Sequence, residues 1–142
     1  MQDKTADSNA IFGEPIAFIH VYTRAQAIAD GVLVDVTETA REAGFRIPVA
    51  ITAAAWSKTV EWSKADSMRQ TPQDEAGRLW DVLWMSCVTA RRASIGCRVP
   101  VQLHVVPRGG TGKRPRLTVL SMAIGPGDDG EPVLTLMNPD ED

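Results

Sequence analysis

The clearest hydrophobic pattern in the chain lies between Thr71 and Ile95. Apolar side chains recur there every three or four residues, the spacing of one face of an α-helix; they are Ala76, Leu79, Trp80, Leu83, Trp84, Cys87 and Val88. Thr71 is placed to cap such a helix, Pro72 suits its first turn, and Gly96 supplies a stop. We therefore predict one long core helix over Thr71–Ile95, with Trp80 and Trp84 packed in the core.

Shorter signals precede this helix. Threonine is a good N-cap residue, and it stands before three short helical patterns, at Thr23, Thr37 and Thr52. Gly31 and Gly44 follow the first two patterns and are natural stops. Extended runs are predicted at 15–21, 32–36 and 45–51, and Lys64–Gln70 is expected to be a polar connection into the long helix.

The last third of the chain has a different pattern. Three β-type runs, 99–106, 117–124 and 132–137, are separated by segments rich in Gly, Pro and Asp. Consecutive strands with short connections are typical of an antiparallel meander. We predict one α+β domain over residues 14–138, in which the long helix and the shorter ones pack on this C-terminal sheet. Residues 1–13 are expected to be a disordered tail, and 139–142 a frayed acidic tail.

Composition narrows the class of protein. The chain has 142 residues, 44% of them hydrophobic, and a formal net charge of -3. These values suit a globular domain and argue against a dedicated nucleic-acid binder, although a local basic patch remains compatible with them. The first residues lack the pattern of a secretion signal, and no apolar run is long enough for a membrane span, so a cytoplasmic protein without a membrane role is expected. Cys87 is predicted to be a buried thiol; a disulfide with Cys97 is the alternative.

The sequence shows no catalytic constellation. His20 and His104 lie in apolar extended runs, where a structural role is expected, and no set of residues has the spacing of a metal site. The acidic residues Asp128, Asp129 and Glu131 stand among glycines and a proline, which predicts a turn. We therefore predict no catalytic residues, no metal and no cofactor.

The basic segment RGGTGKRPR, residues 108–116, is the strongest candidate for a binding site. It is not a phosphate-binding P-loop, because Arg114 and Pro115 follow Lys113 where that motif has Ser or Thr and a helix. It is either a mobile hairpin loop or an electrostatic contact for nucleic acid or an acidic protein surface, made by Arg108, Lys113, Arg114 and Arg116. The cations Arg91, Arg92 and Arg98 extend this patch only if the end of the long helix lies near it.

Trp62 is the second candidate for partner binding. Trp56 and Trp80 fall on apolar helix faces, whereas Trp62 follows Glu61 and precedes a polar stretch. An exposed tryptophan is a common anchor of protein interfaces. We predict that Trp62 anchors a partner together with the basic segment; burial of Trp62 is the alternative, and the sequence leaves open whether the two lie next to each other.

One short segment resembles the beginning of ADP-ribosyltransferases. FIHVYTRAQAIADGVLV has the order strand with histidine, helix, glycine and second strand, with His20, Tyr22 and Gly31 in the corresponding places. It lacks the His-Gly-Thr type of nucleotide contact, and no catalytic glutamate is matched. The resemblance implies an NAD-using enzyme with a deep pocket at His20 and Tyr22, which is one alternative function.

A longer resemblance covers most of the chain from Tyr22 onward. The segments VYTRAQAIADGVLVDVTETAREAGFRIPVAITAAAW, QDEAGRLWDVLWM and IGPGDDGEPVLTLMNPDED are similar to a family of small uncharacterised proteins on bacterial plasmids, integrative elements and prophages. This setting implies a non-catalytic accessory protein that binds a host complex, most concretely an inhibitor of a CRISPR or restriction system. A DNA-binding plasmid-maintenance protein is the other alternative, and the oligomeric state stays open.

Overall fold

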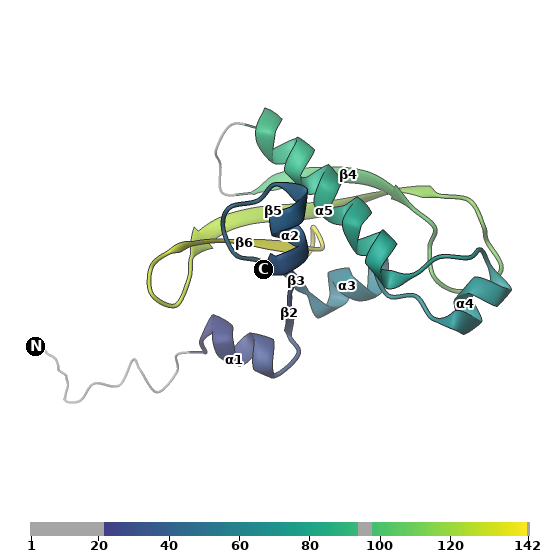
Figure 1. Cartoon of the computed structure of the whole chain (residues 1–142), viewed down its shortest axis with the longest axis horizontal. Coiled ribbons are helices and arrows are strands. Elements are labelled where there is room, and N and C mark those ends of the chain that lie inside the picture. The colour runs from purple at the N-terminus through teal and green to yellow at the C-terminus, as the bar shows by residue number, and fades with distance from the viewer. Residues whose placement is uncertain (1–21, 94–97, 142) are drawn as a thin grey trace, which may run out of the picture.

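The computed structural model describes residues 22–93 and 98–141, which form a five-stranded mixed sheet with helices on both faces (Figure 1). The helices are α1 (Arg24–Ala29), α2 (Thr37–Ala43), α3 (Ala53–Thr59), α4 (Lys64–Arg69) and α5 (Glu75–Arg92). The strands are β2 (Leu33–Asp35), β3 (Val49–Thr52), β4 (Val99–Val105), β5 (Arg116–Pro126) and β6 (Pro132–Met137). The predicted strand 15–21, with His20, and the residues Ile95, Gly96 and Cys97 lie outside the described residues.

The sheet has the strand order β2-β3-β6-β5-β4. Its C-terminal part, β4 to β6, is the predicted antiparallel meander. The sheet then continues into the first half of the chain, because β3 pairs in parallel with β6, with Ile51 opposite Leu136, and β2 pairs antiparallel with β3. The prediction of an α+β domain is confirmed, and the sheet is wider than its C-terminal meander.

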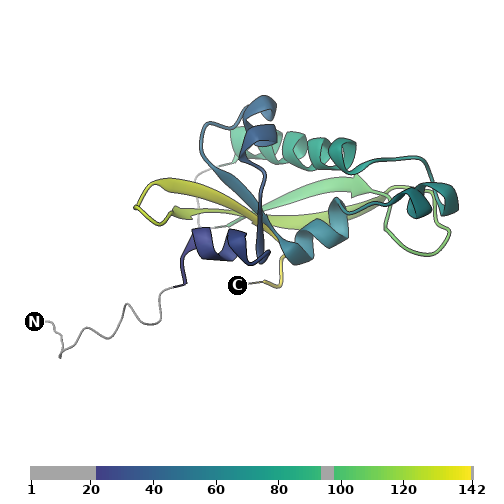
Figure 2. The ribbon, with the colours of Figure 1, turned by 60° about the horizontal axis from the view of Figure 1, so that its bottom comes forward.

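The helices form two layers around the sheet. In Figure 2, α2 and α5 lie on one side of it and α1 on the other, while α3, which follows β3 directly, contacts α5 as well as the strands β2, β3 and β6. Along β4, Val101, Leu103 and Val105 are buried, while Gln102 and His104 are exposed, which is the alternation of a strand with one covered face. The fully buried centre is apolar and joins the sheet to α5 through Ile51, Leu83, Leu120, Leu134 and Leu136.

The long helix is shorter than predicted and turned relative to its predicted face. It begins after Asp74, whose carboxylate accepts a hydrogen bond from Gly77 N at 2.7 Å, so Asp74 and not Thr71 is the N-cap. Ser67 Oγ donates a hydrogen bond to Gln73 O and accepts one from Gln73 N, and these bonds hold the residues before Asp74 outside the helix. The covered face carries Arg78, Leu79, Val82, Leu83, Ser86 and Cys87.

The segment predicted as a polar connection contains a helix. Ser63 and Asp66 form a capping box, in which Asp66 N donates to Ser63 Oγ at 3.1 Å and Ser63 N donates to Asp66 Oδ2 at 2.7 Å. Lys64–Arg69 therefore forms α4, which lies with the β4–β5 loop at one end of the molecule (Figure 1). This helix places the residues that hold the basic segment.

Two smaller expectations also change. Thr37 is the first residue of α2 rather than its cap; its N and Oγ1 donate to Asp35 Oδ1. The C-terminal segment is attached through Glu141, whose Oε2 accepts hydrogen bonds from Asn138 N and Thr52 Oγ1, both at 2.7 Å. Glu141 is therefore not part of a frayed tail. The predicted caps at Thr23 and Thr52 are confirmed.

Candidate functional site

The basic segment is anchored to α4 by an ion pair with Asp66. Arg108 Nε donates to Asp66 Oδ2 at 2.6 Å, and Arg108 also pairs with Glu61 at 3.0 Å. Asp66 is 1% exposed, and the hydrogen bond from Arg108 holds the pKa of its carboxyl well below the usual range, against the effect of burial. The same bond raises the pKa of Arg108. Arg108 therefore has a structural role, and its contact with a partner stays a prediction.

Gln70, the last residue before the loop into α5, fixes the backbone of the segment. Its Nε2 donates to the carbonyls of Pro107 at 2.8 Å and Gly112 at 2.6 Å, and its Oε1 accepts from Gly109 N at 2.9 Å. Gly109 has a φ of 111°, a conformation that favours glycine. We name residues 108–116 the basic loop. The buried side chain of Gln70 therefore bonds two backbone atoms of the basic loop, at Gly109 and Gly112, and one just before it, at Pro107.

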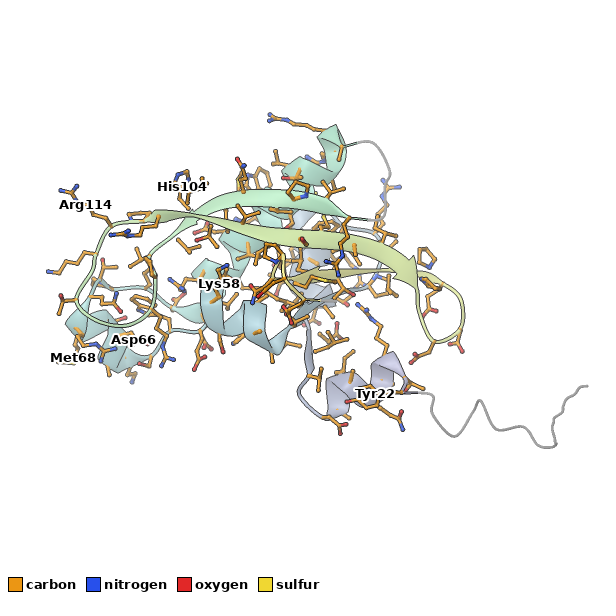
Figure 3. All side chains as sticks on the ribbon, turned by 180° about the vertical axis from the view of Figure 1, so that it is seen from behind. Tyr22, Lys58, Asp66, Met68, His104 and Arg114 are labelled. Atoms are coloured by element: carbon orange, nitrogen blue, oxygen red, sulfur yellow. The ribbon has the colours of Figure 1, made fainter. Side chains whose placement is uncertain are left out.

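The other cations of the basic loop point into solvent. Lys113, Arg114 and Arg116 are exposed, and within residues 22–93 and 98–141 no carboxylate pairs with them. Figure 3 shows Arg114 and the α4 residue Met68 toward the same end of the molecule. Met68 is 89% exposed. This end therefore presents three exposed cations on a backbone that α4 and Gln70 hold in place.

The cations of the α5 end do not extend this patch. In the β4–β5 pairing, Val105 lies opposite Arg116 at the end nearest the basic loop, and Val99 lies opposite Met122 at the other end. Six residue steps of about 3.3 Å separate these ends by about 20 Å. The end of α5, at Arg92, and the start of β4, at Val99, lie at this second end (Figure 1), so the condition for extending the patch to Arg91, Arg92 and Arg98 is not met.

Trp62 is not an exposed anchor. It is 5% exposed, its indole N–H donates to Ser67 Oγ at 3.0 Å, and the guanidinium of Arg78 lies 4.5 Å from its ring centroid. The capping box at Ser63 turns the chain so that the ring packs beneath α4. Trp62 therefore helps to hold the same end of the molecule from inside, and burial, the alternative stated from the sequence, is correct.

Trp80 and Trp84 are exposed instead. They are 37% and 45% exposed and stack on each other with ring centroids 5.9 Å apart. The prediction that both are core residues is wrong, because the covered face of α5 is centred on Val82 and Leu83 rather than on the tryptophans. Trp56 is partly buried against the core, as predicted.

Several sequence candidates have structural roles. The Asp128 carboxylate accepts hydrogen bonds from Arg24 N at 2.7 Å and Ala25 N at 3.0 Å, so the β5–β6 turn holds the start of α1. Cys87 is buried, as predicted. Within residues 22–93 and 98–141, no three potential ligands stand together as a metal site, and no helix has the length and apolar character to cross a membrane.

The region predicted for an NAD-using enzyme is described only in part. Tyr22 is 55% exposed, and its hydroxyl donates to Asp30 Oδ2 at 2.7 Å, which raises the pKa of the phenol. Gly31 has a φ of 79° and follows α1 as a turn residue. His20 lies outside the described residues, so the enzyme alternative stays a prediction.

Sequence reasoning missed Gln70 and Arg78 as organising residues. The signal for α4 was present, since Ser63 and Asp66 have the spacing of a capping box. Arg78 is 4% exposed and donates from Nε to Val60 O at 3.1 Å and from Nη1 to Val106 O at 3.0 Å. A buried arginine gives no hydrophobic signal, so only the structure identifies it.

Comparison with known proteins gives one match. The model of a family of unknown function, DUF6573, matches residues 9–142. No curated protein and no solved structure matches the chain.

Proposed function

The chain belongs to the DUF6573 family of unknown function, and we propose that it is a non-catalytic protein that binds a host protein complex through the basic loop. The observation that supports this proposal most directly is the attachment of the basic loop to α4 by Gln70 and Asp66. A surface that is already ordered loses less conformational entropy when it binds. Lys113, Arg114 and Arg116 are the contact residues of the proposal.

The concrete form of the proposal is an inhibitor of a host defence complex of the CRISPR or restriction type. An acidic protein surface on such a complex would attract the three exposed cations of the basic loop, because opposite charges attract across an interface. Cations on a fixed loop fit an acidic surface of this kind. The genomic setting comes from the resemblance of the chain to accessory proteins of plasmids, integrative elements and prophages, and it is part of the proposal.

Direct DNA binding is the second candidate function, and the same three exposed cations favour it. Each phosphate contact by a lysine or arginine makes binding fall steeply as salt rises. The formal net charge of -3 opposes it, because the rest of the surface repels a phosphate backbone. Duplex and single-stranded DNA titrations of the isolated protein at two salt concentrations separate this function from binding to a protein.

The test is an affinity pull-down from a nuclease-treated bacterial lysate. The triple variant Lys113→Ala, Arg114→Ala and Arg116→Ala is compared with a control that removes three exposed cations elsewhere, Arg46→Ala, Lys58→Ala and Arg92→Ala. Both variants change the net charge equally, so non-specific attraction changes equally. We expect the wild type and the control to retain a stoichiometric protein partner and the loop variant to lose it.

A second readout tests the inhibitor itself. The protein is expressed in a host with an active CRISPR or restriction system, and the efficiency of transformation by a targeted plasmid is measured. The wild type and the control variant should raise this efficiency, and the loop variant should not. If the loop variant retains its partner and its effect, the basic loop is not the binding site; if binding needs DNA, direct DNA binding replaces the proposal.

A further inference from the structure

A cavity lies beside Trp80 at the start of α5. It has a volume of about 560 Å³ and is lined by Pro72, Gln73, Asp74, Gly77, Arg78, Trp80 and Asp81. This volume is in the range of small-ligand and side-chain pockets. The lining residues include an aromatic residue, two aspartates, an exposed glycine and Arg78, whose guanidinium is buried.

The buried guanidinium has an unused donor. Arg78 is 4% exposed, and its Nε and Nη1 donate to Val60 O, Val106 O and Gln73 Oε1. Its Nη2 is buried and, among the described residues, has no acceptor. Leaving a buried donor unpaired is unfavourable, by about 1–3 kcal/mol for a typical polar group. The three oxygens that accept hydrogen bonds from Arg78 are all neutral, so a neutral carbonyl oxygen is the acceptor we expect for Nη2 as well.

The rim of the cavity is negative. Asp74 and Asp81 are both exposed, and Asp81 has no hydrogen bond or ion pair to any described residue. An incoming anion would meet these carboxylates before it reached Arg78, whereas a cation would be attracted to them. Trp80 lines the same cavity and is 37% exposed, and a guanidinium or ammonium group is stabilised over such a ring.

We infer that this cavity, the Trp80 cavity, binds an arginine- or lysine-bearing peptide segment of a protein partner. The basic side chain lies over Trp80 with Asp81 and Asp74 as its counter-charges. Arg78 Nη2 has almost no accessible surface, so a main-chain carbonyl of the segment accepts its hydrogen bond only after the lining of the cavity moves to expose it. A Cβ at Gly77 would lie 3.1 Å from Asp74 Oδ1, so the glycine keeps that carboxylate in place, and Trp84 supports the ring of Trp80 by stacking. This site differs in charge and position from the basic loop and does not depend on the function proposed for it.

The probe is an acetylated and amidated peptide of alternating glycine and arginine, titrated into the full chain. Two matched peptides replace each arginine by citrulline, which keeps the shape without the charge, or by glutamate. Binding is followed by the indole N–H signals of the four tryptophans in NMR spectra, assigned with single Trp→Phe variants. We expect the signals of Trp80 and Trp84 to shift and those of Trp56 and Trp62 to stay.

The expected ranking follows from the charges. The citrulline peptide should bind about ten-fold more weakly than the arginine peptide, and the glutamate peptide should not bind. Trp80→Ala and Asp81→Asn should each weaken the arginine peptide by about ten-fold. The basic-loop triple variant serves as the control and should bind at least as tightly as the wild type.

The contribution of Arg78 is tested with Arg78→Lys, which keeps a charge but lacks Nη2. If circular dichroism shows that this variant is folded, its affinity for the arginine peptide should be lower than that of the wild type. If the variant is not folded, the inference is tested by Trp80→Ala and Asp81→Asn only. Equal binding of the arginine and citrulline peptides, shifts centred on Trp56, or full affinity of Trp80→Ala would overturn the inference. Shifts of the Trp80 signal on dilution without peptide would also overturn it, in favour of a second copy of this chain.

Discussion

The centre of the sheet and the α4 end of the molecule are stabilised by different interactions. At the centre, Leu83 of α5 packs against the strands together with Leu120 and Leu134, all nearly inaccessible to solvent. At the α4 end, the buried residues are Asp66, Gln70 and Arg78, and hydrogen bonds and ion pairs hold the chain. Apolar packing has no charge to titrate, whereas the α4 end depends on the charge of Asp66 and Arg108. The surface proposed for binding is therefore built on the part of the fold most sensitive to pH and to single polar substitutions.

The largest effect is expected at the centre. Leu120→Ala removes a side chain with 0% exposure and should lower the free energy of unfolding by about 3 kcal/mol, since a cavity replaces packed atoms. Leu117→Ala, in the same strand but 58% exposed, is the matched control and should change it by about 0.5 kcal/mol or less. Urea unfolding measures both. Equal losses would show that β5 is not packed as described.

The next effect is expected at Arg78. Arg78→Met keeps much of the volume and the contact with Trp62, but it leaves the carbonyls of Val60 and Val106 without a donor. We expect a loss of about 2 kcal/mol, because unpaired buried acceptors are unfavourable. Arg41→Met on α2, which is exposed, is the control. A variant as stable as the wild type would mean that the desolvation penalty of the buried guanidinium equals the stabilisation from its hydrogen bonds. Polar contacts would then add no net stability at the α4 end.

A smaller, pH-dependent effect is expected at Asp66. The folded-state pKa of Asp66 is depressed by Arg108, so its contribution to stability is present above the unfolded-state pKa, near pH 4 for an ordinary aspartate, and is lost as the pH falls below that value. Asp66→Asn should therefore be less stable than the wild type at pH 7, and the difference should shrink toward pH 2.5. Asp66 pairs with Arg69 as well as with Arg108. We place this loss below that of Arg78→Met, because the side chains of Arg108 and Arg69 are 37% and 45% exposed and water can solvate them once they are unpaired.

Urea unfolding of both proteins between pH 7 and pH 2.5 measures this effect. Glu61→Gln is the control, because Glu61 also pairs with Arg108 but is 38% exposed. An exposed pair of this kind contributes about 1 kcal/mol or less. A constant difference between wild type and Asp66→Asn at every pH would show that the capping box, and not the charge, is the contribution of Asp66.

The comparison also explains which parts of the fold were predictable. Periodic apolar residues located the meander and the body of α5, because burial of an alternating or helical stripe is read directly from the sequence. The parallel pairing of β3 with β6 was not predictable, since Ile51 and Leu136 are distant in the chain and no local signal specifies their pairing. The face of α5 was misjudged because Arg78 and Ser86, two polar residues, lie on its buried side.

The candidate site was predictable only in part. The cations Lys113, Arg114 and Arg116 were recognised from their sequence, and the structure places them on the surface. The attachment of the basic loop was not, because Gln70 binds backbone atoms that carry no sequence signature. The sequence predicted an exposed Trp62 and a buried Trp80, whereas the structure has Trp62 buried and Trp80 exposed. The burial of Trp62 depends on contacts with Ser67 and Arg78, which its neighbours in the sequence do not indicate.

The smallest effect is expected on the outer face of α5. Trp84→Ala should lower the free energy of unfolding by about 1 kcal/mol or less, because the ring is 45% exposed and its neighbour Trp80 is exposed as well. Val82→Ala, two residues earlier in the helix and 0% exposed, removes a smaller side chain but should lower it by about 2 kcal/mol. Urea unfolding of the two variants tests this order. The reverse order would mean that the tryptophans belong to the core after all. The expected order means that truncating either of these two surface rings changes the free energy of unfolding little. A binding role of Trp80 and Trp84 can then be measured separately from stability.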